Sequence, residues 1–163
     1  MQKLVTLALT GVALFAQESA ADWTKFDFLM GRWIGVAGAK DTPLGPGQGG
    51  FSFEADLNRK IIVRKNHAEY DKGVTHDDLM VIYAEGATRA IYFDSEGHVI
   101  RYNISFKGKD SVVFESDGAQ PGPKYRLSYW MEKNVMKGTF EVAAPGTAEF
   151  KTYLSWGSQR ANQ

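Results

Sequence analysis

Hydrophobic and polar residues alternate along most of the chain after position 31, in runs of the length of single strands. Phe51, Phe53 and Ala55 alternate with polar residues, and apolar side chains again take every second position from 100 to 106. This period of two predicts strands with one buried face and one solvated face. Turn-forming residues interrupt the runs roughly every 8–12 positions, a spacing typical of an all-β sandwich or barrel.

The pattern predicts about ten strands, and the short connections favour antiparallel pairing of chain neighbours as a meander. A meander that closes on itself has no exposed edges. The sequence therefore predicts an all-β fold, a single antiparallel up-and-down β-barrel of about 8–10 strands. The strands are expected at 33–40, 50–57, 60–70, 79–85, 89–94, 98–107, 111–115, 125–131, 135–143 and 148–156.

A crowded apolar stretch precedes the first predicted strand. Phe26, Phe28, Leu29 and Met30 carry too much apolar mass for a surface loop. Asp22 can cap a single helical or 3₁₀ turn that begins just after it. We expect this short helical turn to plug one end of the barrel, and an amphipathic helix packed on the sheet is the alternative.

The residues that follow the apolar turn are expected to shape the same end of the barrel. Gly31 lets the backbone change direction where a side chain would clash. Trp33 is predicted to close the barrel floor, and its indole N–H then needs a hydrogen-bond partner.

The Gly31–Arg32–Trp33 sequence after an apolar turn resembles the Gly-x-Trp signature of the calycin barrels, which include the lipocalins and the fatty-acid-binding proteins. The layout is similar to that of secreted bacterial lipocalin-like proteins of unassigned function, over nearly all of the mature chain. The resemblance implies a barrel that holds small apolar molecules. It also implies a late arginine over the tryptophan ring, a part that Arg160 could take as a cation–π lid; a frayed terminal arginine is the alternative.

The first 21 residues have the order of a secretory signal peptide. Lys3 lies in a short basic start, residues 4–16 form an apolar segment, and residues 19–21 are small. The apolar segment is too short for a comfortable membrane span. We expect a signal peptide at 1–21, a lipocalin-like barrel domain at 22–163, and an exported protein, periplasmic or extracellular. An uncleaved N-terminal anchor helix is the alternative.

Composition narrows the range of partners. The 19 lysines and arginines match 19 aspartates and glutamates, without a basic stripe, so neither nucleic acid nor insertion into a membrane after signal cleavage is expected. The chain has no cysteine, which excludes disulfides, a cysteine nucleophile and thiolate metal sites.

Metal and haem sites have little support in the sequence. The three histidines, His67, His76 and His98, do not form a three-ligand set by their spacing. Nitrobindin-type haem barrels resemble the chain at the apolar turn and the Gly-x-Trp, but their haem-ligand histidine lies in the C-terminal part, where this chain has none. We predict no metal, no haem and no other cofactor.

Hydrolytic catalysis also has little support, since the chain has no G-x-S-x-G motif. The carboxylate pairs Glu54/Asp56 and Asp77/Asp78 are expected to be solvated, the second in an acidic loop that begins at His76. The stretch from 94 to 97 is expected to be a turn, because it has too few oxygens at the right offsets for a calcium loop. No catalytic residue is assigned.

The binding hypothesis depends on which side chains face the barrel interior. The alternating apolar positions are expected to point inward, and Arg64, Arg101 and Arg126 to face water. Inward tyrosine hydroxyls need hydrogen bonds, which a mixed pocket supplies. The glycine-rich residues 45–50 fit G-x-G-x-x-G but lead into a strand, so they are expected to form a loop at the barrel mouth, opposite Trp33. The candidate ligand-binding residues are Phe51, Phe53, Tyr102, Phe106, Tyr125, Tyr129 and Phe140.

The sequence thus predicts an exported barrel that binds a small, largely apolar ligand. With no arginine expected inside, a neutral or weakly polar ligand is favoured over a fatty acid. Two alternatives stay open. One is a cavity enzyme of the isomerase or cyclase type, with Tyr102 or Glu69 as acid or base. The other is a structural or protein-binding barrel with a packed interior.

Overall fold

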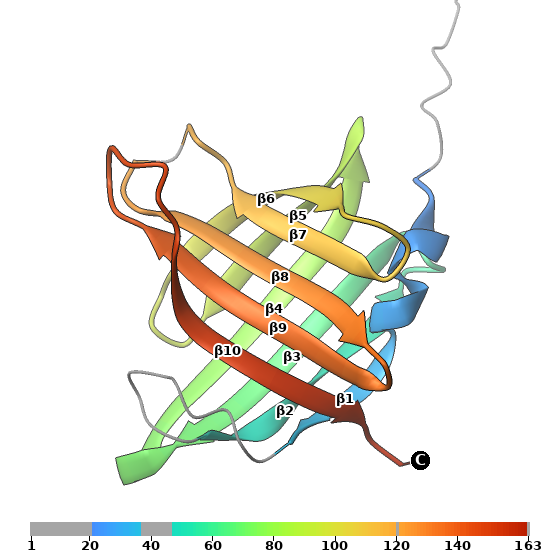
Figure 1. Ribbon diagram of the computed structural model, residues 1–163. Coiled ribbons are helices and arrows are strands. Elements are labelled where there is room, and N and C mark those ends of the chain that lie inside the picture. Colours follow the sequence, from blue (N-terminus) through green and yellow to red (C-terminus); the bar gives the residue numbers. More distant parts are fainter. Residues whose placement is uncertain (1–20, 37–46, 120, 163) are drawn as a thin grey trace, which may run out of the picture.

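The structure is a computed structural model that describes residues 21–36, 47–119 and 121–162. Ten strands close into one antiparallel barrel in chain order, and β1 completes the barrel by pairing with β10 (Figure 1). The predicted fold class is confirmed. The strands are β1 Gly31–Gly35, β2 Gly47–Asp56, β3 Ile61–Tyr70, β4 Val74–Glu85, β5 Ala87–Asp94, β6 Val99–Phe106, β7 Ser111–Ser116, β8 Lys124–Glu132, β9 Val135–Ala143 and β10 Lys151–Arg160.

Several strand boundaries differ from the predicted ones: β1 begins at Gly31 rather than at position 33, and β10 spans Lys151–Arg160 rather than 148–156. β2 begins at Gly47, so the described part of the predicted glycine-rich loop is strand, while residues 37–46 lie outside the described residues. β4 begins at Val74 rather than at position 79, because it pairs with β3 back to a short 3₁₀ turn, η2, at Asp71–Gly73. The predicted acidic loop that begins at His76 is therefore wrong, and its residues alternate between the two faces of β4.

The apolar N-terminal stretch forms a 3₁₀ helix, η1, at Trp23–Leu29. The carboxylate of Asp22 caps it by accepting a hydrogen bond from the backbone N–H of Thr24 at 3.3 Å. Phe26 and Leu29 are buried, and the Phe26 ring lies edge-on to Phe106, with ring centres 5.0 Å apart. Phe106 is the last residue of β6, so η1 covers one end of the barrel (Figure 1).

Trp33 connects η1 to the first and last strands of the barrel, β1 and β10. Its side chain is buried, and its indole N–H donates to the backbone oxygen of Leu29 at 2.7 Å. The guanidinium of Arg160, at the end of β10, lies 4.4 Å from the centre of the Trp33 ring and donates to the backbone oxygen of Met30. Gly31 has a φ of +106°, and a Cβ there would lie 2.7 Å from Nη1 of Arg160. A side chain at position 31 would therefore be strained and would displace the arginine.

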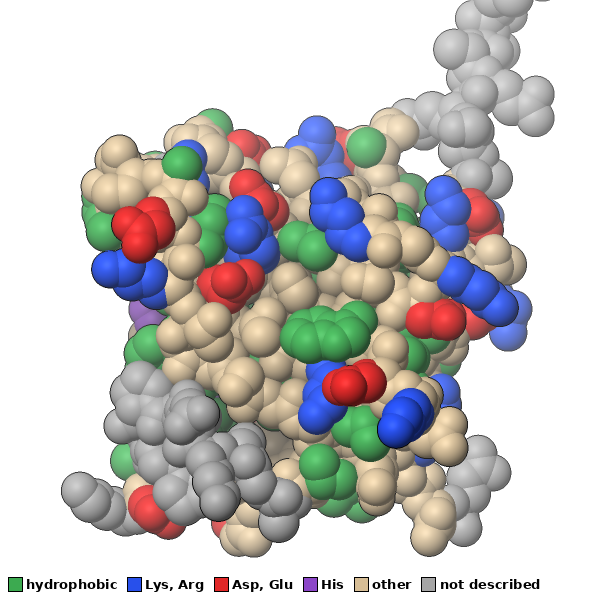
Figure 2. All heavy atoms as spheres, viewed as in Figure 1, with side chains coloured by type: hydrophobic (Ala, Val, Ile, Leu, Met, Phe, Trp, Pro, Cys, Tyr) green, Lys and Arg blue, Asp and Glu red, His purple; other side chains and the backbone are tan. Residues whose placement is uncertain are grey.

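The half of the barrel nearest η1 has a packed interior. Its fully buried side chains include Phe53, Met80, Ile82, Phe114 and Met136. On the face shown in Figure 2, acidic and basic side chains are interspersed. Within the described ranges, no helix has the length and apolar character that a membrane crossing requires.

Candidate functional site: an interior cavity with a charged network

A cavity of about 440 Å³ occupies the half of the barrel away from η1. Its wall includes Ile100 and Tyr102 from the N-terminal half of β6, whereas η1 packs on the last residue of that strand. The remaining wall is largely aromatic and aliphatic, with polar side chains from β3, β4 and the β5–β6 turn. The described part of the glycine-rich stretch, Gly47 to Gly50, borders it.

The structure divides the seven predicted ligand-binding residues into two groups. Phe51, Tyr102, Tyr125 and Phe140 line the cavity. Phe53, Phe106 and Tyr129 lie outside its lining. Phe53 and Tyr129 pack on each other in the filled half, with ring centres 5.5 Å apart, and Phe106 packs on η1.

Trp156 on β10 also lines the cavity and was not among the predicted residues. It lies across Gly138 of β9, its pairing partner, where a Cβ would come within 2.3 Å of the indole ring. A glycine paired with a tryptophan on the neighbouring strand can indicate that the tryptophan lies over the glycine. This pairing could be recognised only once the register of β9 and β10 was known.

Arg64 points into the barrel, so the prediction that it faces water is wrong. It has the same parity on β3 as the buried Ile62, and only 5% of its side chain is exposed. Its guanidinium forms an ion pair with Asp78 of β4, whose side chain is 4% exposed. It also lies 5.4 Å from the centre of the Phe51 ring and 5.9 Å from that of Tyr129. Arg101 is exposed and Arg126 is partly exposed.

The counter-charge explains how an arginine can be buried here. Burial is the largest single influence and disfavours the charged form, but Asp78 and, to a smaller extent, Tyr129 and Tyr92 together outweigh it and raise the pKa of Arg64 above its ordinary value. Arg64 therefore stays charged. The burial of Asp78 corrects the expectation that it is solvated, whereas Glu54 and Asp56 are exposed as predicted.

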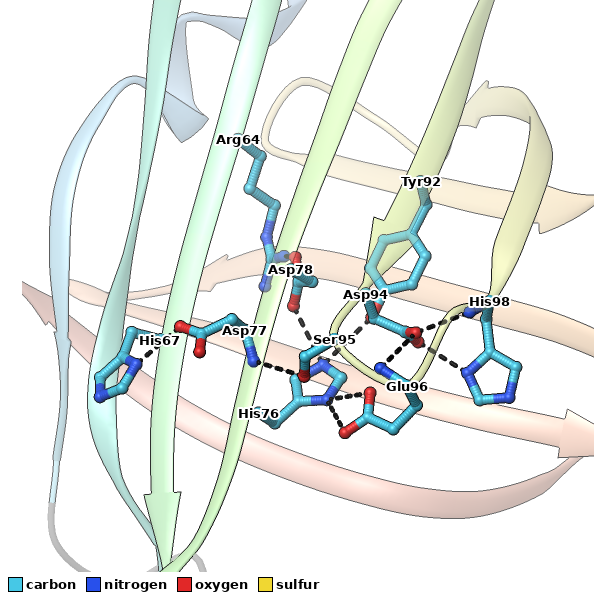
Figure 3. A network of polar contacts seen from close by, with 10 residues as sticks. All are labelled: Arg64, His67, His76, Asp77, Asp78, Tyr92, Asp94, Ser95, Glu96 and His98. Atoms are coloured by element: carbon cyan, nitrogen blue, oxygen red, sulfur yellow. Dashed lines mark hydrogen bonds and ion pairs between the residues drawn. The ribbon is translucent and has the colours of Figure 1, made fainter.

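His76 extends this pair into a network that reaches Glu96 in the turn between β5 and β6 (Figure 3). Its Nε2 lies 3.3 Å from a carboxylate oxygen of Asp78 and 3.1 Å from the hydroxyl of Tyr92. Its Nδ1 lies 2.9 Å from a carboxylate oxygen of Glu96. The hydrogen bond to Asp78 is the largest cause that raises the pKa of His76 to about 9. At neutral pH the interior therefore holds two cations, Arg64 and His76, among carboxylates.

The raised pKa of His76 predicts a loss of stability in alkali. A histidine whose pKa is higher in the folded than in the unfolded chain binds more protons when folded, so its contribution is complete below about pH 6.5 and disappears as the pH rises through about 9. We expect the free energy of unfolding from urea titrations to fall by roughly 1–3 kcal/mol over this interval. The His76→Gln variant should lose most of this fall, and the exposed His98→Gln variant should keep it. A small fall remains expected from exposed His67, whose pKa is raised by its hydrogen bond to Asp77. If the free energy of unfolding depended on pH in the same way in wild type and His76→Gln, His76 would not be the group responsible.

Three tyrosines of the interior stay protonated. Burial raises the pKa of Tyr102 and Tyr92 well above the ordinary value and that of Tyr129 to about 12. Protonated hydroxyls can donate hydrogen bonds to a bound molecule. Glu69, the other acid-base group of the predicted enzyme alternative, is exposed to solvent near His67 and lies outside the cavity lining. The two groups therefore do not share one site.

A second polar cluster lies in the turn between β5 and β6. Ligand atoms of Asp94, Glu96 and His98 lie within 4.8 Å of one another. Asp94 accepts hydrogen bonds from the backbone N–H groups of Glu96 and His98 at 3.1 and 2.8 Å and lies 2.8 Å from Nδ1 of His98. These hydrogen bonds explain the cluster, because they stabilise the turn between β5 and β6. The prediction that the chain holds no metal or haem stays a prediction.

Comparison with known proteins supports the fold alone. No protein-family model matches the sequence, and no curated protein matches it. The structure is similar to the crystal structure of Rv2717c from M. tuberculosis, with a TM-score of 0.59 and 12% sequence identity. The match covers 86% of this chain and 97% of that chain.

Proposed function

We propose that this chain is an exported barrel that holds a small, largely apolar molecule in its interior. The cavity of about 440 Å³ carries this proposal. Small-molecule sites commonly have volumes of roughly 300–1,000 Å³, mostly apolar walls and a few polar groups that fix orientation. A structural barrel packed throughout its interior would fill this half as densely as the half near η1, so the cavity favours ligand binding.

The proposal includes a calycin-like character. It is supported by the Gly31–Arg32–Trp33 sequence, by η1 at the barrel end, and by the Arg160 guanidinium over the Trp33 ring. The similarity to Rv2717c is compatible with it at the level of fold. The order of basic, apolar and small residues at positions 1–21 supports export.

A single protein preparation tests both export and ligand binding. When the 163-residue chain is expressed in a bacterium, we expect protein in the periplasm with an N-terminus near Asp22. This protein should bind N-phenyl-1-naphthylamine, a neutral dye that fluoresces in apolar surroundings, in a saturable way. Intact Met1 protein in the membrane fraction would contradict export.

A matched pair of variants locates the dye. Ala68 lines the cavity, whereas Ser105 is exposed on the outer face of β6. Ala68→Phe should fill part of the cavity and strongly weaken dye binding, and Ser105→Phe should leave it unchanged. Equal binding by wild type and Ala68→Phe would show that the dye binds elsewhere and would remove the support for an interior site.

A further inference from the structure

Four buried polar side-chain atoms have no hydrogen-bond partner within the described ranges: Nε of Arg64, the hydroxyls of Tyr102 and Tyr129, and Nε1 of Trp156. Folded proteins leave few such atoms unpaired, because each costs free energy in an apolar environment. Arg64, Tyr102 and Trp156 all line the cavity, whereas Tyr129 does not. Three of the four unpaired groups therefore belong to residues of the cavity wall.

These three groups have the same hydrogen-bonding character. The Nε–H of arginine and the indole N–H of tryptophan can only donate, and the protonated hydroxyl of Tyr102 can donate as well. A ligand that satisfies them must present acceptor atoms. A purely hydrocarbon ligand would leave all three donors buried and unpaired.

The charges around the cavity decide between an anionic and a neutral acceptor. Arg64 is already compensated by Asp78, and His76 lies between Asp78 and Glu96. Asp94, which lies 2.8 Å from Nδ1 of His98, adds a further carboxylate to the wall. A ligand carboxylate would therefore bring an uncompensated negative charge into a site that is already rich in carboxylates, which is costly away from water.

We propose that the ligand carries an uncharged oxygen acceptor, of the ketone, aldehyde or ester type, that binds against Arg64, Tyr102 and Trp156 while its apolar part fills the aromatic cavity. This inference rests on the proposed function. An arginine does point inward, and an uncharged ligand is favoured because Asp78 already compensates its charge.

Competition against N-phenyl-1-naphthylamine tests the chemistry of the ligand. The competitors 2-decanone, decanoate and decane carry chains of equal length and differ in their head group. For the exported protein, 2-decanone should bind at least about tenfold more tightly than either of the others. Tighter binding of decanoate would overturn the uncharged head group. Equal binding of decane, or no competition by 2-decanone, would overturn the acceptor. Absence of dye binding would be a different result, because it would refute the proposed function itself.

Removal of single hydroxyls tests the location of the head group. Tyr102→Phe keeps the ring and removes a donor from the cavity wall, so it should weaken 2-decanone binding by about three- to tenfold and leave decane binding unchanged. Tyr83→Phe removes a hydroxyl on the outer face of β4, outside the cavity lining, and it should leave both affinities unchanged. An unchanged preference in Tyr102→Phe, or an equal loss in the two variants, would overturn the assignment. Far-ultraviolet circular dichroism confirms that both variants are folded.

Discussion

Replacing Asp78 with asparagine should lower the free energy of unfolding by roughly 3–5 kcal/mol, the usual cost of removing one partner from a buried ion pair. The variant has nearly the same shape but leaves the guanidinium of Arg64 without a counter-charge inside the barrel. Arg64→Met should cost a similar amount, because it leaves the carboxylate of Asp78 buried with His76 as its remaining cationic partner. Urea unfolding at neutral pH measures both changes.

Two further variants separate the buried charge from general damage. The double variant Arg64→Met with Asp78→Leu should lose much less stability than the sum of the single changes, since apolar pairs commonly replace buried ion pairs without loss. Glu115→Gln removes a partner of Arg126 in an exposed pair and should cost at most about 1 kcal/mol. Single variants at positions 64 and 78 as stable as wild type would show that the pair is well hydrated in solution.

Trp33→Ala should destabilise the protein by roughly 3–5 kcal/mol, the range for removing a large buried aromatic side chain. The change also removes the hydrogen bond to Leu29, the stacking on Phe51 and the surface on which Arg160 lies. Thermal unfolding followed by circular dichroism gives the measurement.

Trp130 on β8 is the matched control for this prediction. Its side chain is partly exposed, on the opposite face of β8 from the buried Tyr129. Trp130→Ala should therefore cost clearly less than Trp33→Ala. Equal melting temperatures for Trp33→Ala and wild type would mean that Trp33 does not hold η1 and the first and last strands together.

The fold could be predicted because its main determinants are local. Alternation marks β2, β6 and β8, and short turns leave a meander as the simplest arrangement. The start of β4 could not be predicted in this way. Asp77 and Asp78 have low intrinsic preference for strands, and pairing with β3 is what keeps them extended.

The charged part of the site could not be predicted from the sequence for a related reason. Residues 61–63 are all β-branched, so the beginning of β3 has no alternation to show which face is buried. Arg64 is stable inside because Asp78 arrives from the next strand, a contact that depends on register rather than on either local sequence. The aromatic wall was more accessible to prediction, since Phe51 and Tyr102 lie in cleanly alternating runs. How far along the barrel the filled part extends depends on η1, so Phe53 and Tyr129 could not be separated from the lining.

The chain-order topology also determines when the barrel can become complete. All strand pairs but one join neighbours in the sequence, whereas β1 must find β10, which places Trp33 opposite Arg160. Hairpins between neighbours are low in contact order, but this last pairing requires closure of a loop almost as long as the domain. Because the chain is synthesised from its N-terminus, one edge of β1 stays without a partner strand until residues 151–160 are available. During that time the nascent sheet is exposed to edge-to-edge association with other chains.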